Sequence, residues 1–336
     1  MIWRRHVPGK DSRRTLTGRR PAGSLVLFSA AVDKPVVIVN PRSGGGLSEK
    51  RWFGLVGALS DGLGTFDTRF TEAPGHARTL AEEESRSGRS LVIAFGGDGT
   101  ISEVADGLVA AGGTAELGII PRGTGGDFRR SLGIANEVAK AAEHVRKSKP
   151  RSIDVGRVSF VAHDGSKTSR HFVNVTSVGF SSVVASRANQ GSKRLGGKAA
   201  FLSAVVRSLL TYDNAEITFS VDDGEPRRMA VLLAAVGNGR FFGGGMKICP
   251  EALLDDGYFD LVTVGDMGRL EVLAKIHRIY SGQHLSMKEV QAVRCQRLHV
   301  AGVDSSANIP LEIDGETPGR LPATFEIVKG ALRLRA

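Results

Sequence analysis

The sequence predicts an α/β domain with a doubly wound parallel sheet, followed by a mostly antiparallel β domain. The first reason is length, because 336 residues exceed the roughly 250–300 residues at which a single hydrophobic core usually stops growing. The second is an alternation of strand-like and helix-like segments before Pro150, which is typical of a parallel sheet with helices on both faces. The third is a series of short strand-like segments after Pro150, which indicates an antiparallel sandwich or barrel.

Three strand-like runs before Pro150 each lead into a loop that is rich in glycine or carries proline. They are PVVIVNPRSGGG (35–46), LVIAFGGDGT (91–100) and LGIIPRGTGGDF (117–128). Helical patterns are expected between them, at roughly 48–60, 75–87 and 100–111. The last helix should begin with a capping box, in which Thr100 and Glu103 satisfy free backbone N–H groups. Because the carboxyl ends of parallel strands share one edge of a sheet, the three loops should face one crevice.

The segments after Pro150 alternate between strand-like runs and turn signals such as Asp223-Gly224 and Asp256-Gly257. Strands are expected within the ranges 152–162, 169–180, 215–224, 227–239, 258–267, 292–302 and 310–316. Helical patterns interrupt them near 197–211 and 268–280. The expected organisation is a leader at 1–32, an α/β domain at 33–153, a β domain at 154–318, and a C-terminal segment at 319–336 that could return to the first domain.

Composition excludes a disordered or fibrous chain, since 41% hydrophobic and 24% charged residues are typical of soluble globular proteins. Seven basic residues and one acid give residues 1–20 a net charge of +6, which leaves only +4 of the total +10 for the rest. We expect a basic, disordered leader or a start codon placed too far upstream, attraction of this segment to anionic lipid being the alternative, and no nucleic-acid partner. No run approaches the roughly 18 apolar residues of a transmembrane helix, so contact with a membrane should be peripheral. Cys249 and Cys295 lack metal-ligand spacing and should be buried, in a reducing compartment.

The residues after the second strand, Gly96 to Gly99, contain more glycine than a plain turn requires. Glycine lets a ligand approach backbone N–H groups closely, and a helix N-terminus carries about half a positive charge, so phosphate is the natural ligand. The familiar phosphate motif GxxxxGKS/T is missing, and no GxGxxG follows a strand. Asp98 would repel a phosphate unless a cation lay between them, and Mg²⁺ commonly bridges the two groups. The residues alone therefore predict a site for a magnesium-bound nucleotide or polyphosphate and leave the acceptor open.

The stretch GGDGTISEV (96–104) resembles the nucleotide loop shared by the diacylglycerol kinase catalytic-domain family, the sphingosine and ceramide kinases, and the NAD kinases. Other stretches resemble the lipid-kinase branch in the family's order: VNPRSGGG, GIIPRGTGGDFRRSLGI, IDVGRV, FVNVTSVGFSSVV, VGNGRFFGGGMKICPEALLDDGYFDLV and LEIDGE. They span about 36–316, and the longest is similar to the bacterial soluble diacylglycerol kinases. The resemblance implies an NAD kinase-like α/β domain followed by an antiparallel β-sandwich. One position departs from the family pattern, because Gly126 stands where the family's GTxNDF has asparagine.

By resemblance, the three loops supply the residues that surround ATP: Asn40, Ser43, Gly44, Gly45, Gly96, Gly97, Asp98, Gly99, Thr100, Glu103, Gly123 and Thr124. Glu103 could reach the nucleotide sugar or serve only as part of the helix cap. Arg42 or Arg122 could offset the triphosphate charge or be solvated.

Asp314, in EIDGE, resembles the family's general base, which would accept the proton of a lipid hydroxyl. Asp-Gly after a strand is also the usual signal for a hairpin turn, which is the structural alternative. By resemblance, Asp127 and Asp154 join Asp98 and Asp314 as catalytic acids in a network of metal and water. Their structural alternatives are a helix cap for Asp127 and a strand-end turn for Asp154.

The same resemblance implies a second magnesium site in ALLDDGYFD (252–260). The Asp256 carboxylate and the backbone carbonyls of Leu253 and Tyr258 would form an oxygen-only ligand set, which suits a hard cation. A tight Asp-Gly turn is the alternative, and both can hold together.

The resemblance implies a lipid kinase that uses ATP and Mg²⁺ and whose acceptor is diacylglycerol or a related lipid alcohol, such as a sphingoid base. Apolar residues that could line a lipid cleft are Phe180, Val183, Val184, Phe241 and Phe242. We expect a cytoplasmic protein that acts peripherally at the inner membrane surface, and a homodimer is left open. Two other classes stay open: a kinase with a soluble acceptor such as NAD, and a nucleotide- or lipid-binding protein without activity.

Overall fold

The computed structural model describes residues 34–190 and 197–336, so the expected leader at 1–32 lies outside the described residues. Residues 34–150, called here the N-terminal lobe, contain a parallel sheet with the strand order β2-β1-β3-β4. These strands are β1 (Val36–Val39), β2 (Asp67–Phe70), β3 (Leu91–Gly96) and β4 (Glu116–Pro121). The apolar runs of β1, β3 and β4 are buried, as the sequence predicts for strands covered on both faces. The sequence does not predict β2, because this edge strand has no apolar run.

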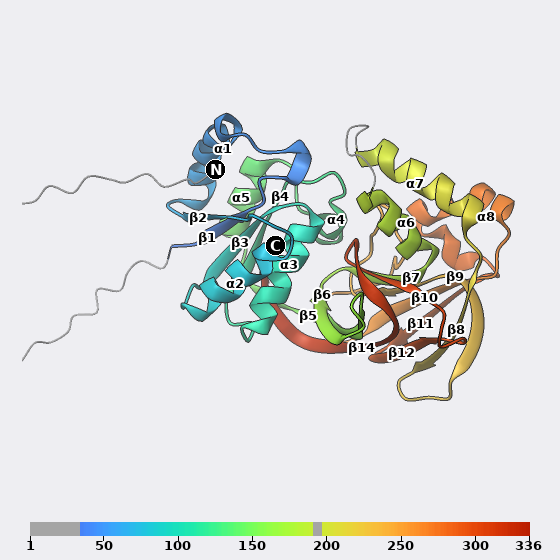
Figure 1. The fold of residues 1–336 in the computed structure, drawn as a ribbon. Helices are drawn as coiled ribbons and strands as arrows, with labels where there is room; N and C mark the ends of the chain where they lie inside the picture. Colours follow the sequence, from blue (N-terminus) through green and yellow to red (C-terminus); the bar gives the residue numbers. More distant parts are fainter. Residues whose placement is uncertain (1–33, 191–196) are drawn as a thin grey trace, which may run out of the picture. The chain divides into compact units, whose positions relative to one another are not determined.

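Five helices pack on this sheet: α1 (Glu49–Leu63), α2 (His76–Arg86), α3 (Asp98–Ala110), α4 (Asp127–Leu132) and α5 (Val138–Lys147). Helix α1 lies beside α5, and α2 lies beside α3 (Figure 1). The second pair packs closely because a Cβ on Gly107 would lie 2.2 Å from the carbonyl oxygen of Arg78. The predicted helices are confirmed as α1, α2 and α3, whereas α4 and α5 have no counterpart in the prediction.

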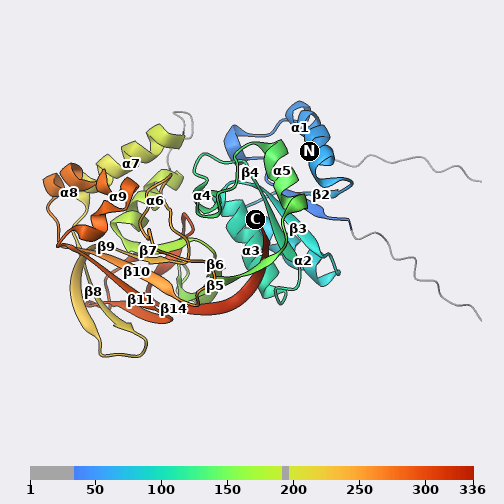
Figure 2. The same cartoon turned by 180° about the vertical axis from the view of Figure 1, so that it is seen from behind.

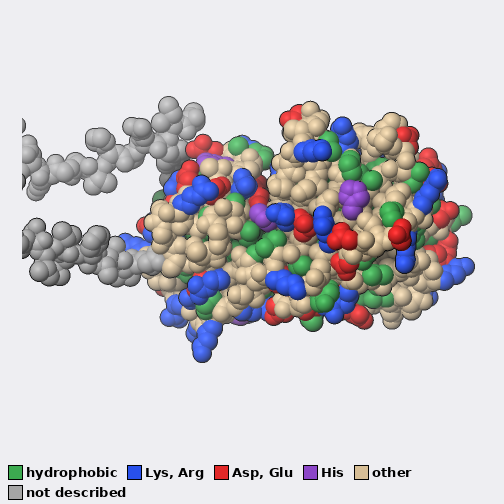
Figure 3. All heavy atoms as spheres, turned by 90° about the horizontal axis from the view of Figure 1, so that it is seen from below, with side chains coloured by type: hydrophobic (Ala, Val, Ile, Leu, Met, Phe, Trp, Pro, Cys, Tyr) green, Lys and Arg blue, Asp and Glu red, His purple; other side chains and the backbone are tan. Residues whose placement is uncertain are grey.

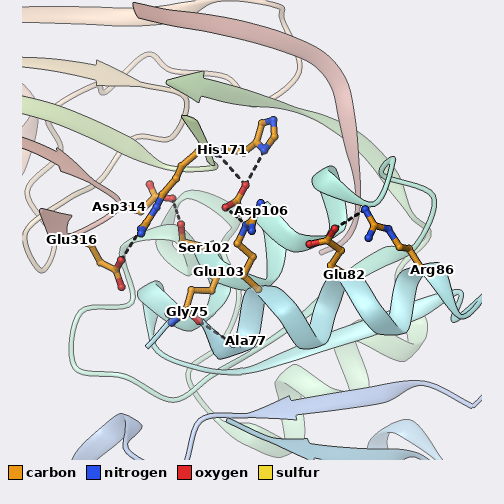
Figure 4. A network of polar contacts seen from close by, with 12 residues as sticks. Gly75, Ala77, Glu82, Arg86, Ser102, Glu103, Asp106, His171, Asp314 and Glu316 are labelled. Carbon is orange, nitrogen blue, oxygen red and sulfur yellow. Dashed lines mark hydrogen bonds and ion pairs between the residues drawn. The ribbon is translucent and has the colours of Figure 1, made fainter. Parts of the chain in front are cut away.

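The predicted capping box at Thr100 and Glu103 is wrong. Helix α3 begins at Asp98, and no side chain caps its N-terminus. The Glu103 carboxylate instead accepts hydrogen bonds from the backbone N–H groups of Gly75 (2.8 Å) and Ala77 (3.0 Å), as Figure 4 shows. Glu103 therefore caps the neighbouring helix α2, because the free N–H groups of a helix can be satisfied by any acceptor near them.

Residues 151–336, called here the C-terminal lobe, form mainly antiparallel strands. Nine of them are β5 (Arg151–Ala162), β6 (Lys167–Phe172), β7 (Val175–Gly179), β8 (Ala215–Val221), β9 (Arg227–Gly237), β10 (Phe259–Gly265), β11 (Val290–Cys295), β12 (Arg297–Gly302) and β13 (Pro310–Ile313). Buried side chains from two layers of these strands share one core, in which the rings of Phe172 and Phe259 stack with centroids 5.6 Å apart. The lobe is therefore a sandwich, one of the two arrangements that the strand pattern predicts.

Strand β14 (Glu316–Arg335) joins the two lobes through main-chain hydrogen bonds. It pairs antiparallel with β5, β12 and β13, and its last residues pair parallel with β4, where Arg333 lies opposite Glu116. In Figures 1 and 2 it is the long red strand that curves from one lobe to the other. The pairing with β5 is irregular between Val328 and Leu332.

The C-terminal lobe also carries α6 (Phe180–Gln190), α7 (Gly197–Thr211), α8 (Arg269–Lys275), α9 (Arg278–Ser281) and a 3-10 helix, η3 (Gln283–Ser286). An apolar cluster, which includes Val205, Val262 and Val272, lies between these helices and strands β7, β9 and β10. Helices α7 and α8 confirm the predicted helical patterns, whereas α6 begins within the range predicted as strand. Within residues 34–190 and 197–336, no helix has both the length and the apolar character needed to cross a bilayer. Cys249 and Cys295 are buried free thiols, as predicted.

Candidate active site

A cavity of about 650 Å³ lies between helices α6–α9 and the strands of the C-terminal lobe. Its polar lining includes four carboxyl groups, which come from both lobes: Asp98, Asp127, Glu312 and Asp314. Most of the remaining lining is apolar and includes Phe180, Val184 and Phe242, three of the five residues proposed for a lipid cleft. Val183 and Phe241, the other two, are not part of the lining. The cavity thus combines a group of acids with a large apolar surface, a combination typical of ligand sites.

Asp98 lies in the first turn of α3, directly after strand β3. Its Oδ2 accepts a hydrogen bond from the backbone N–H of Gly126 (2.6 Å), and its Oδ1 accepts one from Phe128 N–H (3.2 Å). Asp98 therefore satisfies free N–H groups at the start of α4. Gly126 has a φ of +67°, and a Cβ there would lie 2.5 Å from Nε of Arg129. Gly126, which stands where the family pattern has asparagine, therefore contacts Asp98 through its backbone N–H alone.

Asp127 connects α4 to the loop that follows β9. Its Oδ2 accepts a hydrogen bond from Gly244 N–H (2.7 Å), and its Oδ1 forms an ion pair with Nη1 of Arg130 (2.8 Å). Burial raises the pKa of Asp127, and the nearby Asp98 carboxylate adds to that effect. Both carboxylates flank Gly125, where a Cβ would lie 2.7 Å from Asp98 Oδ2 and 3.8 Å from Asp127 Oδ2. The two acids therefore share one small region of the cavity wall.

Asp314 lies in the turn between β13 and β14, in a left-handed conformation with a φ of +46°. Its Oδ1 accepts hydrogen bonds from the N–H groups of Asn174 and Val175, both at 3.1 Å. Its Oδ2 accepts one from Val173 N–H (3.1 Å) and one from the hydroxyl of Ser102 (2.7 Å). Burial raises the pKa of Asp314 to about 6, although these four donors oppose that shift. The turn that the Asp-Gly signal predicts is present, and it aims this carboxylate into the cavity.

The contact between Ser102 and Asp314 joins the lobes, because Ser102 belongs to α3 (Figure 4). A second contact of α3 lies nearby, where Asp106 accepts a hydrogen bond from His171 N–H of β6 (3.1 Å) and lies 2.8 Å from His171 Nδ1. Asp106 also pairs with Nε of Arg78 at 2.7 Å. Helix α3 therefore carries Asp98 at its N-terminus and meets the C-terminal lobe along its length.

Glu312 is a site residue that the sequence analysis misses. It is buried beside the cavity, and its carboxyl group accepts hydrogen bonds from the Ser177 hydroxyl and from Gly315 N–H. Burial raises the pKa of Glu312 to about 8, and the Asp314 and Asp127 carboxylates add to the shift. The signal in the sequence is a second acid, two residues before Asp314, where a strand would place both side chains on the same face.

The three glycine loops come together at the carboxyl ends of β1, β3 and β4, as predicted. Asn40 Nδ2 donates to Thr100 Oγ1 (3.0 Å), which joins the first loop to α3. A Cβ on Gly123 would lie 2.7 Å from the Cα of Gly97, so the third loop approaches the second this closely only because residue 123 is glycine. Thr124 of the third loop and Asp98 of the second both line the cavity, so these two loops lie at the same cavity as the other acids.

Arg122 has a different role from the predicted ones. Its Nη1 donates to the carbonyl of Ser43 (2.7 Å), and its Nη2 donates to the carbonyl of Gly46 (3.0 Å). Ser43 begins the short 3-10 helix η1 (Ser43–Gly45), and Gly44, Gly45 and Gly46 all have positive φ values. Arg122 therefore holds the first glycine loop against the third. Arg42 is exposed.

Asp154 is not brought to the cavity with the other predicted acids. Its Oδ2 accepts a hydrogen bond from Gly257 N–H (2.6 Å), and its Oδ1 accepts one from Gly330 N–H (2.7 Å) in the irregular part of β14. Asp154 is buried and is absent from the cavity lining. Among the described residues, no three acidic, histidine or cysteine side chains lie close enough together to hold a metal ion. Of the four predicted acids, Asp98, Asp127 and Asp314 therefore line the cavity together with Glu312, and Asp154 does not.

The predicted second magnesium site does not fit the residues around Asp256. The Asp256 carboxylate forms an ion pair with the Arg294 guanidinium and accepts a hydrogen bond from Tyr258 N–H (3.0 Å). The Arg294 Cζ lies 4.6 Å from the centre of the Tyr258 ring, and Lys329 Nζ lies 5.6 Å from it. The Arg294 guanidinium already pairs with the Asp256 carboxylate, and Lys329 lies near the adjacent Tyr258 ring, so a dication would meet repulsion here. The structural alternative, a tight turn at Asp256-Gly257, is present, and the positive charge beside Asp256 comes from Arg294.

Comparison with known proteins identifies the family. A model of the diacylglycerol kinase catalytic domain matches residues 34–158, and a model of the YegS C-terminal NAD kinase β-sandwich-like domain matches residues 174–336. A diacylglycerol kinase from Mycobacterium tuberculosis is 30% identical over 305 residues, which cover 90% of this chain and 95% of that protein. The chain belongs to the diacylglycerol kinase family. The predicted family, which is one of lipid kinases, and the predicted fold class are thereby confirmed.

Two further relatives of the kinase span most of its length. A protein from Pseudomonas aeruginosa named as a probable YegS-like lipid kinase is 33% identical over 270 residues, which cover 79% of this chain and 83% of that protein. A solved structure from Bacillus anthracis, whose name also refers to a diacylglycerol kinase, has a TM-score of 0.70 and 26% identity, and the match covers 90% of this chain and 97% of the other. The similarity therefore extends over both lobes of the kinase.

Proposed function

We propose that this kinase transfers the γ-phosphate of magnesium-bound ATP to the hydroxyl group of diacylglycerol or a closely related lipid alcohol, with Asp314 as the general base. One observation carries the proposal: Asp98 and Asp314, which come from different lobes, line the same largely apolar cavity. A soluble acceptor such as NAD would leave most of that apolar wall without a partner, so the lining favours a lipid.

The nucleotide is proposed to bind at the glycine loops. Backbone N–H groups of the loops and the N-terminus of α3 favour an anionic ligand, and close approach requires the glycines that are present at 96, 97 and 99. Glu103 is less suited than the loop residues to bind the nucleotide sugar, because both of its carboxylate oxygens already accept hydrogen bonds from the start of α2. We therefore assign Glu103 to the support of the loops.

Asp98 is the better placed of two neighbouring acids for the magnesium ion that accompanies ATP, because Asp127 already forms an ion pair with Arg130. Mg²⁺ is usually bound by one or two carboxylates together with phosphate oxygens, and these two carboxylates flank the same glycine in the cavity wall. When bound, the ion supplies neutralisation of the negative charge on the phosphate oxygens. The backbone N–H groups of Gly126 and Phe128 hold the Asp98 carboxylate in place whether or not the ion is bound.

Asp314 is proposed to take the proton of the lipid hydroxyl as its oxygen attacks the γ-phosphorus and ADP leaves. With a pKa of about 6, the carboxyl group is ionised at neutral pH and is also a stronger proton acceptor than an ordinary aspartate. The hydrogen bonds from Ser102 and the backbone of residues 173–175 fix its orientation. The rest of phosphoryl transfer depends on positioning, which the loops and α3 supply.

The decisive measurement is phosphate transfer from radiolabelled ATP to diacylglycerol in mixed micelles. We expect Asp314→Asn to lower kcat by roughly 10²–10⁴-fold, the usual contribution of a general base, with a smaller effect on the KM for ATP. Asp164→Asn is the matched control, because Asp164 is an exposed acid that accepts hydrogen bonds from Ser166 and lies outside the cavity lining.

Two results would refute the proposal. Undiminished turnover in Asp314→Asn would remove Asp314 as the base. Phosphorylation of NAD or of water-soluble alcohols, without phosphorylation of diacylglycerol or a sphingoid base, would replace the lipid acceptor with a soluble one.

A further inference from the structure

The helix α8 exposes apolar side chains on the side that faces away from the cavity. Leu270 is 83% exposed and Leu273 is 51% exposed, at the i, i+3 spacing that places both on one face of a helix. Val272, which lies between them in sequence, is buried and lines the cavity. This short helix therefore forms a thin wall between the apolar interior and an apolar part of the surface.

The elements that flank α8 around the cavity show the same pattern. On α7, Leu210 is 65% exposed and Val206 is also exposed, whereas their neighbour Val205 lines the cavity. On α9, Tyr280 is 54% exposed and also lines the cavity. These three helices thus carry five of the ten large hydrophobic side chains that are exposed in the described part of the chain.

Charge on these helices is compatible with an anionic surface. Lys275 pairs with Glu271 and Glu289, and Arg269 pairs with Asp213, so most of the acids here are already neutralised. Arg207 on α7 and Arg278 on α9 are exposed, and neither forms an ion pair with any described residue. By contrast, Figure 3 shows the face seen from below in the view of Figure 1. On this face acidic and basic side chains are intermingled, and hydrophobic side chains form only small separate areas.

We propose that Val206, Leu210, Leu270, Leu273 and Tyr280 form a docking surface, through which the kinase inserts into the outer part of an anionic lipid bilayer. This inference rests on the proposed function, because a lipid acceptor must pass from the bilayer into the cavity. Apolar side chains next to cationic ones bind such a membrane by burying hydrocarbon and by attraction to anionic headgroups. Tyr280, which reaches both the surface and the cavity, suits the boundary between hydrocarbon and water.

The test is co-sedimentation of the full chain with vesicles of equal parts phosphatidylcholine and phosphatidylglycerol. The double variant Leu270→Glu, Leu273→Glu should bind at least about tenfold more weakly, because burial of one leucine side chain is worth at least that factor. The matched control is Phe53→Glu on α1, where a side chain that is 67% exposed lies in the other lobe and outside the cavity lining. Arg278→Glu should weaken binding to these vesicles and have little effect with phosphatidylcholine alone.

Kinase activity on two forms of the acceptor separates docking from catalysis. The double variant should lose activity on long-chain diacylglycerol in vesicles and keep wild-type activity on a short-chain diacylglycerol dispersed in water. Unchanged vesicle binding of the double variant would overturn the docking surface. So would sedimentation velocity that shows a wild-type dimer converted to a monomer by these substitutions, since a second copy would then cover the surface. Vesicle binding that depends on Leu270 and Leu273, in a protein that phosphorylates no lipid, would uphold docking and refute the proposed function instead.

Discussion

Asp314 is held between two opposing influences. Burial disfavours its charged form, whereas the Ser102 hydroxyl and three backbone N–H groups favour it, and the balance leaves a pKa of about 6. Below that pH the group carries a proton and cannot accept another. The proposed reaction should therefore slow as the pH falls through about 6, and Ser102 helps to set where that loss begins.

The variant Ser102→Ala should raise the pKa of Asp314 by roughly 1–2 units, since a hydrogen bond to a charged group contributes about 1.5–3 kcal/mol and one pKa unit corresponds to about 1.4 kcal/mol. The acidic limb of kcat/KM for the lipid should move to higher pH by the same amount, while the rate at alkaline pH is retained. Ser159→Ala, at an exposed serine of β5, should leave the profile unchanged. An acidic limb that does not move would show that Asp314 does not control it.

At the scale of elements, the first glycine loop is held by the side chain of Arg122. Three consecutive glycines with positive φ values give it little stiffness of its own, and Arg122, at the end of β4, holds two of its carbonyls. A guanidinium can donate to both carbonyls at once, which an ammonium group at the end of a flexible chain cannot do with the same geometry. The first glycine loop is therefore ordered by Arg122, which follows the end of strand β4.

The variant Arg122→Ala should raise the KM for ATP by roughly 10–100-fold, because the lost hydrogen bonds to a charged group contribute about 1.5–3 kcal/mol. The KM for the lipid should stay the same, since the lipid is proposed to bind in the other lobe. Arg122→Lys should recover only part of the affinity, and Arg146→Ala, at an exposed arginine of α5, should have no effect. Equal changes in both KM values would point to general loss of structure.

For the molecule as a whole, strand β14 joins the strands of the two lobes into one sheet, and Asp154 supports this strand. All strands within residues 34–190 and 197–336 belong to a single 14-stranded sheet, and β14 contributes pairs on both sides. Asp154 stabilises the irregular part of β14 by accepting from Gly330 N–H, and it holds the Asp256-Gly257 turn by accepting from Gly257 N–H. This buried acid therefore supports the connection between the lobes.

The variant Asp154→Asn should lower the free energy of unfolding by about 2–3 kcal/mol, because an amide can accept only one of these two hydrogen bonds and turns a donor towards the other. Urea denaturation measures this loss, and Asp255→Asn, at an exposed acid next to the same turn, should cost little. Turnover below the unfolding transition should be retained. Lost turnover with full stability would return Asp154 to the catalytic group that the sequence predicts.

Much of the fold is predictable because its signals are local. Apolar runs identify β1, β3 and β4, and the glycines after them mark the loops that meet at the site. The remaining features depend on residues distant in sequence, such as Ser102 and Asp314, which lie 212 positions apart. Glu103 fits a capping box in sequence and yet caps α2, because a local pattern does not reveal which neighbouring helix has free N–H groups. The pairing of Arg294 with Asp256 has no local signal either.

The path of β14 has a consequence for how the kinase works. A hinge motion that swings one lobe away from the other would strain the pairing of β14 with β4, unlike in enzymes whose halves are joined by loops alone. We therefore expect the distance between Asp98 and Asp314 to change little during turnover. Entry of the lipid into the cavity should then depend on small local shifts of the helices around it, while the two lobes keep their arrangement.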